Sequence, residues 1–149
     1  MRLLLGVVWL VAGGMKVTDL AGSVWAVRAY QLLPETAAQL VGAGLPVGEI
    51  ALGVLLLAGL GVRAAAVISA VLLAAFVVGI AAAWTRGLRI DCGCFGGGGE
   101  LAAGQNPAYG RELARDAALL LAAGYLARNP AGRYAVDNLG TRHGAETST

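Results

Sequence analysis

Charged side chains are scarce in this sequence. Only 13% of the 149 residues are Asp, Glu, Lys or Arg, whereas roughly a quarter are charged in soluble globular proteins. The formal net charge of +2 is too small to predict binding to nucleic acid. Apolar residues make up 58% and the mean hydropathy is +0.71, so the composition indicates an integral membrane protein.

Metal-ligating side chains are also few. The chain has two cysteines, Cys92 and Cys94, and one histidine, His143, which lies in a polar stretch near its end. A cysteine-rich zinc site needs four ligands, so this composition excludes one, and we expect no metal centre. What remains is a dithiol that can form a disulfide, a bond that persists in oxidising compartments.

Four long apolar segments predict an all-α fold, an integral membrane bundle of four helices. Each segment has about the 20 residues that a helix needs to cross a bilayer. The predicted spans cover residues 2–20, 37–60, 64–84 and 107–128. They form one membrane domain, residues 1–130, followed by a polar tail, residues 131–149. The first segment also resembles a signal peptide, but the three further apolar segments favour a retained span.

The segment between the first two predicted spans is amphipathic. Residues 21–35 carry Trp25, Arg28 and Tyr30 among apolar residues. Trp and Tyr favour the headgroup level of a bilayer. We therefore expect an interfacial helix that lies along the membrane surface as a lid over the bundle.

Two charged residues fall within the predicted spans, Lys16 in the first and Glu49 in the second. A carboxylate is costly in hydrocarbon, so Glu49 should face a partner or a cavity, and Lys16 is the obvious partner. A role of Glu49 in ligand binding or proton transfer stays open, and Lys16 can instead extend to the interface. On the second span, Gly44 and Gly48 have the spacing of a helix-packing face.

The two cysteines lie in a glycine-rich loop, residues 91–99, between the third and fourth predicted spans. Only one residue separates them, so their disulfide closes a small, strained ring. Strain makes a disulfide easier to reduce, which suits exchange better than structure. Gly93 tolerates the unusual backbone angles of such a turn. We therefore predict Cys92 and Cys94 as the redox-active residues.

Charged residues before and within the loop are predicted to tune the thiols. Arg86 and Arg89 would favour a thiolate if they fold towards it. Asp91 would oppose the thiolate or accept a proton from it.

The fourth predicted helix begins at Asn106 and Pro107, with Asn106 as the N-cap and Pro107 at the first helical position. Its polar first half carries Arg115 and Asp116. Neighbours on a helix point about 100° apart, so these two side chains need not pair with each other. We expect one of them to reach the cysteine loop.

A known family shares these features. Asp-Cys-Gly-Cys-Phe-Gly at residues 91–96 follows the third apolar span, Glu49 lies in the second, and Arg115-Asp116 lies in the polar start of the fourth. In this respect residues 1–130 resemble the MauE family of methylamine utilisation membrane proteins, which are related to DoxX-like proteins. The resemblance implies a four-helix membrane protein that assists disulfide formation or maturation in extracytoplasmic proteins, with a thioredoxin-like partner such as MauD.

The predicted function is that of an enzyme, a membrane thiol:disulfide oxidoreductase that exchanges with a thioredoxin-like protein. A quinone is the candidate electron carrier by analogy with other four-helix disulfide-generating proteins, and a pocket lined by Trp84, Phe95 and the fourth helix would hold it. Two alternatives stay open. One is a non-catalytic DoxX-like subunit or assembly factor in which the cysteines tie the loop, and the other is a Cys-x-Cys site for a soft ion such as Cu(I).

The expected location is the cell membrane, as a multi-pass protein. Arginines divide evenly between the two sides of the predicted bundle, so they do not fix its orientation. The very short turn at Arg63 suits the cytosolic face. We therefore expect both termini inside and the cysteine loop outside, where disulfide chemistry is favoured.

Overall fold

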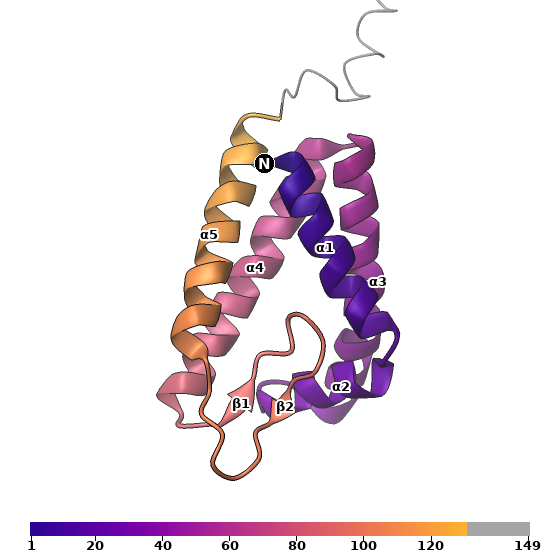
Figure 1. The fold of residues 1–149 in the computed structure, drawn as a ribbon. Helices are drawn as coiled ribbons and strands as arrows, with labels where there is room; N and C mark the ends of the chain where they lie inside the picture. The colour runs from indigo at the N-terminus through magenta and orange to yellow at the C-terminus, as the bar shows by residue number, and fades with distance from the viewer. Residues whose placement is uncertain (131–149) are drawn as a thin grey trace, which may run out of the picture.

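The computed structural model describes residues 1–130 and contains five α-helices and one two-stranded sheet in that range (Figure 1). The predicted polar tail, residues 131–149, lies outside the described residues. The elements are α1 (Arg2–Val17), α2 (Leu20–Ala29), α3 (Glu35–Ala58), α4 (Val62–Thr85), β1 (Ile90–Asp91), β2 (Gly99–Glu100) and α5 (Tyr109–Arg128). The strands pair antiparallel, with Ile90 opposite Glu100. The chain is thus mostly helical, as the composition predicts.

Two helices, α3 and α4, are long and apolar enough to cross a bilayer, with 24 residues each. α1 and α2 meet the same test only as a pair, and they are bent by 102° at the break between them. α5 has 20 residues and a polar first half. The described residues therefore contain two such spans, or three if the bent pair is one span.

The chain turns sharply between α1 and α2, inside the predicted first span. α1 ends at Val17, and Asp19 begins α2 by accepting a hydrogen bond from the backbone N–H of Gly22 at 2.9 Å. Aspartate favours this N-cap position because its side chain satisfies a helix N–H that has no partner within the helix. The first helix therefore ends three residues before the predicted Leu20, and α2, in the segment predicted as an interfacial helix, lies across one end of the bundle (Figure 1).

A close backbone contact holds α2 against α3. A Cβ atom at Gly42 would lie 2.5 Å from the Cα of Val24, so only glycine allows this approach. The hydroxyl of Ser23 donates to the carbonyl oxygen of Gly42 at 2.6 Å. Both groups are buried, so this bond satisfies polar atoms that would otherwise lie in an apolar interior.

Glycines also set the distance between α1 and α3. A Cβ at Gly13 would lie 2.8 Å from the carbonyl oxygen of Pro46, and one at Gly53 would lie 2.9 Å from that of Gly6. The predicted packing face at Gly44 and Gly48 is wrong, because a Cβ at either position meets nothing within 4 Å. The small residues that let two helices approach are thus shared between α1 and α3.

The connection between α4 and α5 folds back into the open end of the bundle, between the α1–α3 pair and the α4–α5 pair (Figure 1). Its glycines contact the other elements there, Gly93 against Ala26 of α2 and Gly96 against Met15 of α1. A buried cluster surrounds it, consisting of Ala29, Ile80, Ala83, Ile90, Cys92, Cys94 and Tyr109. The cysteine loop is therefore part of the interior and not a surface appendage.

α5 begins at Tyr109, two residues later than predicted. The buried phenol of Tyr109 donates to the carbonyl oxygen of Leu88 and accepts from the backbone N–H of Ile90 at 3.2 Å. This anchor ties the first turn of α5 to the end of the α4 connection. Asn106 and Pro107 consequently lie in the connecting segment, and Asn106 is not the N-cap.

We predict that Gly13→Ala destabilises the protein, whereas Gly14→Ala does not. The added methyl group at Gly13 meets a backbone oxygen and the Ile50 side chain at 2.8 Å, while the one at Gly14 meets nothing within 4 Å. The expected loss for Gly13→Ala is about 1–3 kcal/mol. Thermal or denaturant unfolding of both variants in the same detergent measures it, and equal stabilities would contradict the close α1–α3 contact.

Candidate functional site

Cys92 and Cys94 are free thiols that lie beneath the surface, 9% and 7% exposed. Gly93 between them has a φ of +67°, a left-handed conformation that glycine adopts without strain. It also packs so closely on α2 that a Cβ there would lie 2.7 Å from the Cβ of Ala26. This tight turn presents both sulfurs to α5.

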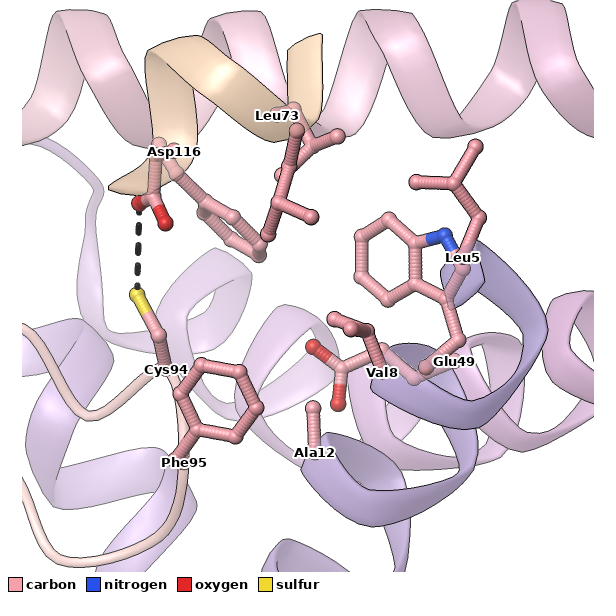
Figure 2. A pocket seen from close by; sticks show the side chains of 11 residues that line it. Leu5, Val8, Ala12, Glu49, Leu73, Cys94, Phe95 and Asp116 are labelled. Carbon is pink, nitrogen blue, oxygen red and sulfur yellow. Dashed lines mark hydrogen bonds between the residues drawn. The ribbon is translucent and has the colours of Figure 1, made fainter. Parts of the chain in front are cut away.

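Cys94 faces a carboxylate. Its thiol donates to Oδ2 of Asp116 at 3.8 Å (Figure 2) and lies 4.0 Å from the carbonyl oxygen of Cys92. The hydrogen bond with the Cys92 sulfur and burial raise the pKa of the Cys94 thiol, and the charge of Asp116 adds to this effect. Cys94 therefore keeps its proton at neutral pH, with a proton acceptor beside it.

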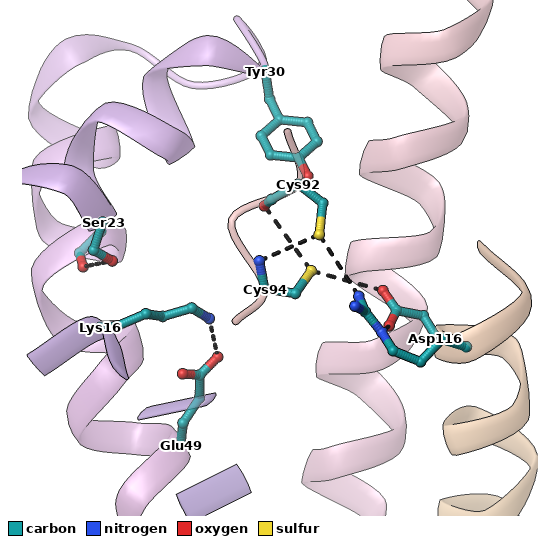
Figure 3. Close-up of polar contacts among 9 residues, drawn as sticks. Lys16, Ser23, Tyr30, Glu49, Cys92, Cys94 and Asp116 are labelled. Atoms are coloured by element: carbon teal, nitrogen blue, oxygen red, sulfur yellow. Dashed lines mark hydrogen bonds and ion pairs between the residues drawn. The ribbon is translucent and has the colours of Figure 1, made fainter. Parts of the chain in front are cut away.

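Cys92 faces hydrogen-bond donors instead (Figure 3). Its sulfur accepts from the backbone N–H of Cys94 at 3.3 Å and from Nη2 of Arg115 at 3.6 Å. Hydrogen bonds from Cys94 and Arg115 lower the pKa of the Cys92 thiol, although its burial opposes them. The thiolate is the nucleophilic form of cysteine. The two sulfurs thus have different surroundings, hydrogen-bond donors around Cys92 and a carboxylate beside Cys94.

Arg115 and Asp116 of α5 both reach the cysteine loop, where the sequence predicted only one. They also pair with each other, with Nε of Arg115 2.8 Å from Oδ1 of Asp116. Asp116 is 2% exposed and Arg115 about one-third exposed. The guanidinium lies over the ring of Phe95, 4.7 Å from its centre. Phe95 and Asp116 thereby hold Arg115 in position beside Cys92.

Glu112 is a site residue that the sequence reasoning missed. It is 7% exposed, and one of its carboxylate oxygens lies within 4.8 Å of both the Cys92 sulfur and a carboxylate oxygen of Asp91. It precedes Asp116 by four residues, so both carboxylates share one face of α5. The four-residue spacing of Glu112 and Asp116, on a helix that follows a cysteine loop, is the sequence signal that could have identified Glu112.

Asp91, Cys92 and Glu112 are the described residues whose donor atoms gather closely enough to hold a metal ion. The set has one sulfur and two carboxylates. Cu(I) prefers soft sulfur ligands, and Cys94 does not belong to the set. This set differs from the two-thiolate copper site considered from the sequence, which would use Cys92 and Cys94. Asp91 itself accepts from the backbone N–H of Gly93 at 3.1 Å, which helps to shape the turn.

The arginines predicted to favour the thiolate lie elsewhere. Arg86 donates to the backbone carbonyl of Tyr30 at 2.8 Å, and Arg89 donates to that of Gln105. Both bind backbone oxygens because they flank the connection where it leaves the membrane end of α4. Arg115 supplies the positive charge in their place.

Tyr30, at the end of α2, covers the loop. Its hydroxyl donates to the carbonyl oxygen of Cys92 at 3.0 Å (Figure 3). Burial raises the pKa of Tyr30, so the phenol stays protonated and remains a donor. The amphipathic segment predicted as a lid thus contacts the backbone of the site directly.

Trp84 and Phe95, predicted to line one quinone pocket, line two different cavities. Trp84, 55% exposed at the end of α4, stacks on Tyr109 at 5.9 Å and lines a surface depression of about 390 Å³ that includes neither cysteine. Phe95 points into the bundle and lines a cavity with Cys94 of only about 20 Å³. That cavity does not fit a quinone ring.

Lys16 and Glu49 form the predicted buried ion pair, with Nζ 2.5 Å from Oε1. Their side chains are 4% and 0% exposed. The ammonium also lies 5.5 Å from the centre of the Phe76 ring. The alternative in which Lys16 extends to the interface is wrong, because the lysine side chain turns into the bundle (Figure 3).

Comparison with known proteins gives one match. The sequence model of the family described as "Methylamine utilisation protein MauE" matches residues 1–128. No curated protein and no solved structure matches. The match covers the five helices and the cysteine loop described above, and it agrees with the resemblance carried by residues 91–96. The chain therefore belongs to the MauE family.

Proposed function

We propose that this protein is a membrane thiol:disulfide oxidoreductase in which Cys92 attacks and Cys94 resolves. The observation that carries the proposal is the opposite surroundings of the two sulfurs. Arg115 donates to Cys92, whereas Cys94 donates to Asp116. Exchange needs a nucleophilic thiolate and a second cysteine that resolves the mixed disulfide, and this asymmetry supplies one of each.

The first step forms a mixed disulfide. The Cys92 thiolate attacks a disulfide sulfur of the partner, a new S–S bond forms, and the partner's second sulfur leaves as a thiolate. Glu112 is placed to take a proton from Cys92 beforehand, since its carboxylate lies within 4.8 Å of the sulfur. Arg115 then stabilises the thiolate.

The second step releases the partner. Cys94 gives its proton to Asp116, and its thiolate attacks the sulfur of Cys92. The bond between Cys92 and the partner breaks, and the partner leaves with two thiols in place of its disulfide. Two electrons have then passed to the partner, and Cys92 and Cys94 form a disulfide. The same steps in reverse deliver a disulfide to a reduced partner.

Two features support a thioredoxin-like protein as the partner, which would bind at the extracytoplasmic face of the membrane. The family resemblance associates the chain with such a partner, and α2 and the loop together close one end of the bundle. In the proposed arrangement α3 and α4 cross the bilayer with α1 and α5 beside them as a four-span bundle. The termini then face the cytosol and the loop faces outside.

We predict that Cys94→Ser accumulates a mixed disulfide and that Cys92→Ser does not. Without Cys94 the covalent intermediate on Cys92 cannot be resolved. Non-reducing electrophoresis of membranes, followed by mass spectrometry of the trapped species, measures this. The double variant Cys92→Ser/Cys94→Ser is the control and should trap nothing.

The absence of a trapped mixed disulfide would point to a structural role for the two cysteines. No trapped species in either single variant, together with a Cys92–Cys94 reduction potential below about −300 mV, would show a structural disulfide. The low exposure of both sulfurs would then reflect a loop tied into an assembly subunit.

We predict that Arg115→Gln slows alkylation of Cys92 at pH 7 by about tenfold. Removing the guanidinium raises the pKa of Cys92, and one pKa unit is a tenfold change in the thiolate fraction well below that pKa. At alkaline pH, where both proteins carry the thiolate, the rates should converge. Arg111→Gln, an exposed change on the same helix, is the matched control. Iodoacetamide labelling read by fragment mass spectrometry assigns the modified cysteine, and identical pH profiles would contradict the role of Arg115.

A further inference from the structure

A small cavity lies between Cys94 of the cysteine loop and Glu49 of the buried ion pair (Figure 2). Apolar side chains form most of its wall, among them Trp9, Phe76 and Phe95. Three polar residues also line it: Cys94 from the loop, Asp116 from α5 and Glu49 from α3. The cavity thus touches the resolving thiol, its proton acceptor and a carboxylate that the exchange steps do not use.

Only one of the two carboxylate oxygens of Glu49 has a hydrogen-bond partner among the described residues. Its Oε1 binds Lys16, but its Oε2 is buried and has no hydrogen-bond partner among the described residues. A buried carboxylate oxygen without a partner is costly, and native structures seldom leave one so. The cavity beside it is the place where a partner can bind.

The cavity has the size for water beside the unpartnered Oε2 of Glu49. Its volume is about 20 Å³, and a buried water needs roughly 10–15 Å³ and two to four polar partners. Glu49, Cys94 and Asp116 supply those partners from opposite walls. An apolar occupant would leave Oε2 of Glu49 unsatisfied, and 20 Å³ is too small for an organic ligand.

Few other charged groups face Glu49. Lys16 comes from α1, and Asp116 and Cys94 lie across the cavity. The buried polar residue of α4 is Ser69, which does not titrate and accepts a hydrogen bond from Trp9 at 2.8 Å. A proton that enters this cavity can therefore be held by Asp116 or by the Glu49–Lys16 pair.

We propose that Glu49 is a proton-relay residue and that water in this cavity carries the Cys94 proton from Asp116 to the Glu49–Lys16 pair. The inference rests on the proposed exchange at Cys92 and Cys94. When Cys94 attacks, its proton passes to Asp116, then through water to Glu49, which becomes neutral beside a charged Lys16. Asp116 is left ionised again. In the reverse reaction Glu49 returns the proton and the thiol of Cys94 is restored.

The test uses a small disulfide in place of the partner. Reduced protein in detergent is mixed with 2,2′-dithiodipyridine. Attack by Cys92 releases one pyridine-2-thione, and attack by Cys94 on the resulting mixed disulfide releases a second. The absorbance of the thione follows both steps. Cys94→Ser, which should release only one, identifies the second phase.

Glu49→Gln is expected to slow the second release about tenfold at pH 7 and to leave the first unchanged. At about pH 9 the second rate should approach that of the wild type, because hydroxide then removes the Cys94 proton directly. Ala12→Val gives the same expectation without changing a charge, since Ala12 lines the cavity and added methyl groups displace water. Glu35→Gln, an exposed change on the same helix in a residue paired with Arg28, is the control and should change neither phase.

The outcomes separate the two proposals. If Glu49→Gln and Ala12→Val both leave the second release unchanged, or slow it equally at every pH, the relay is overturned while the exchange role stands. If the wild type releases no second thione, the exchange role fails. Single removal of Glu49 leaves Lys16 buried and unpaired, which can prevent folding. In that case Ala12→Val and the paired change Lys16→Met/Glu49→Leu, which should show the same pH-dependent slowing, decide the question.

Discussion

The contact between one turn of α5 and the two cysteines is the interaction on which the rest of the site depends. An apolar bundle cannot hold a polar loop unless the buried polar groups find partners. Arg115 and Asp116 provide these partners, and the same bonds that satisfy the loop make the two sulfurs different. Burial of the loop and differentiation of the thiols therefore have one physical cause.

The helices that could be predicted from the sequence are those with a strong apolar signal. α3 and α4 lie within two residues of their predicted ends, because their length and composition allow few other structures. The break between the first span and the interfacial helix was predicted at Leu20 and lies at Asp19, because an N-cap beside an apolar run is a weak signal for the exact position. The start of α5 was misplaced because Tyr109 binds Leu88, a contact between residues far apart in the chain.

The site shows a similar division. The ion pair of Glu49 with Lys16 was predictable from the cost of charge in hydrocarbon. The redox role of Cys92 and Cys94 stays a prediction from their spacing. Distance along the sequence did not predict which arginine lies beside the Cys92 sulfur. Arg86 is nearer to Cys92 in sequence than Arg115, yet the path of the connection takes it to the backbone of Tyr30. Proximity in sequence does not predict which cation a folded loop meets.

Glu112, Arg115 and Asp116 occupy little more than one turn of a single helix. The charged side chains of α5 that lie beside the two sulfurs therefore move together as parts of one helix. A helix turns by about 100° per residue, so a rotation of α5 by one residue position would carry the guanidinium away from one sulfur and the carboxylates away from both. Both thiols therefore depend on the same helix, and a change in the orientation of α5 would alter the pKa values of both together.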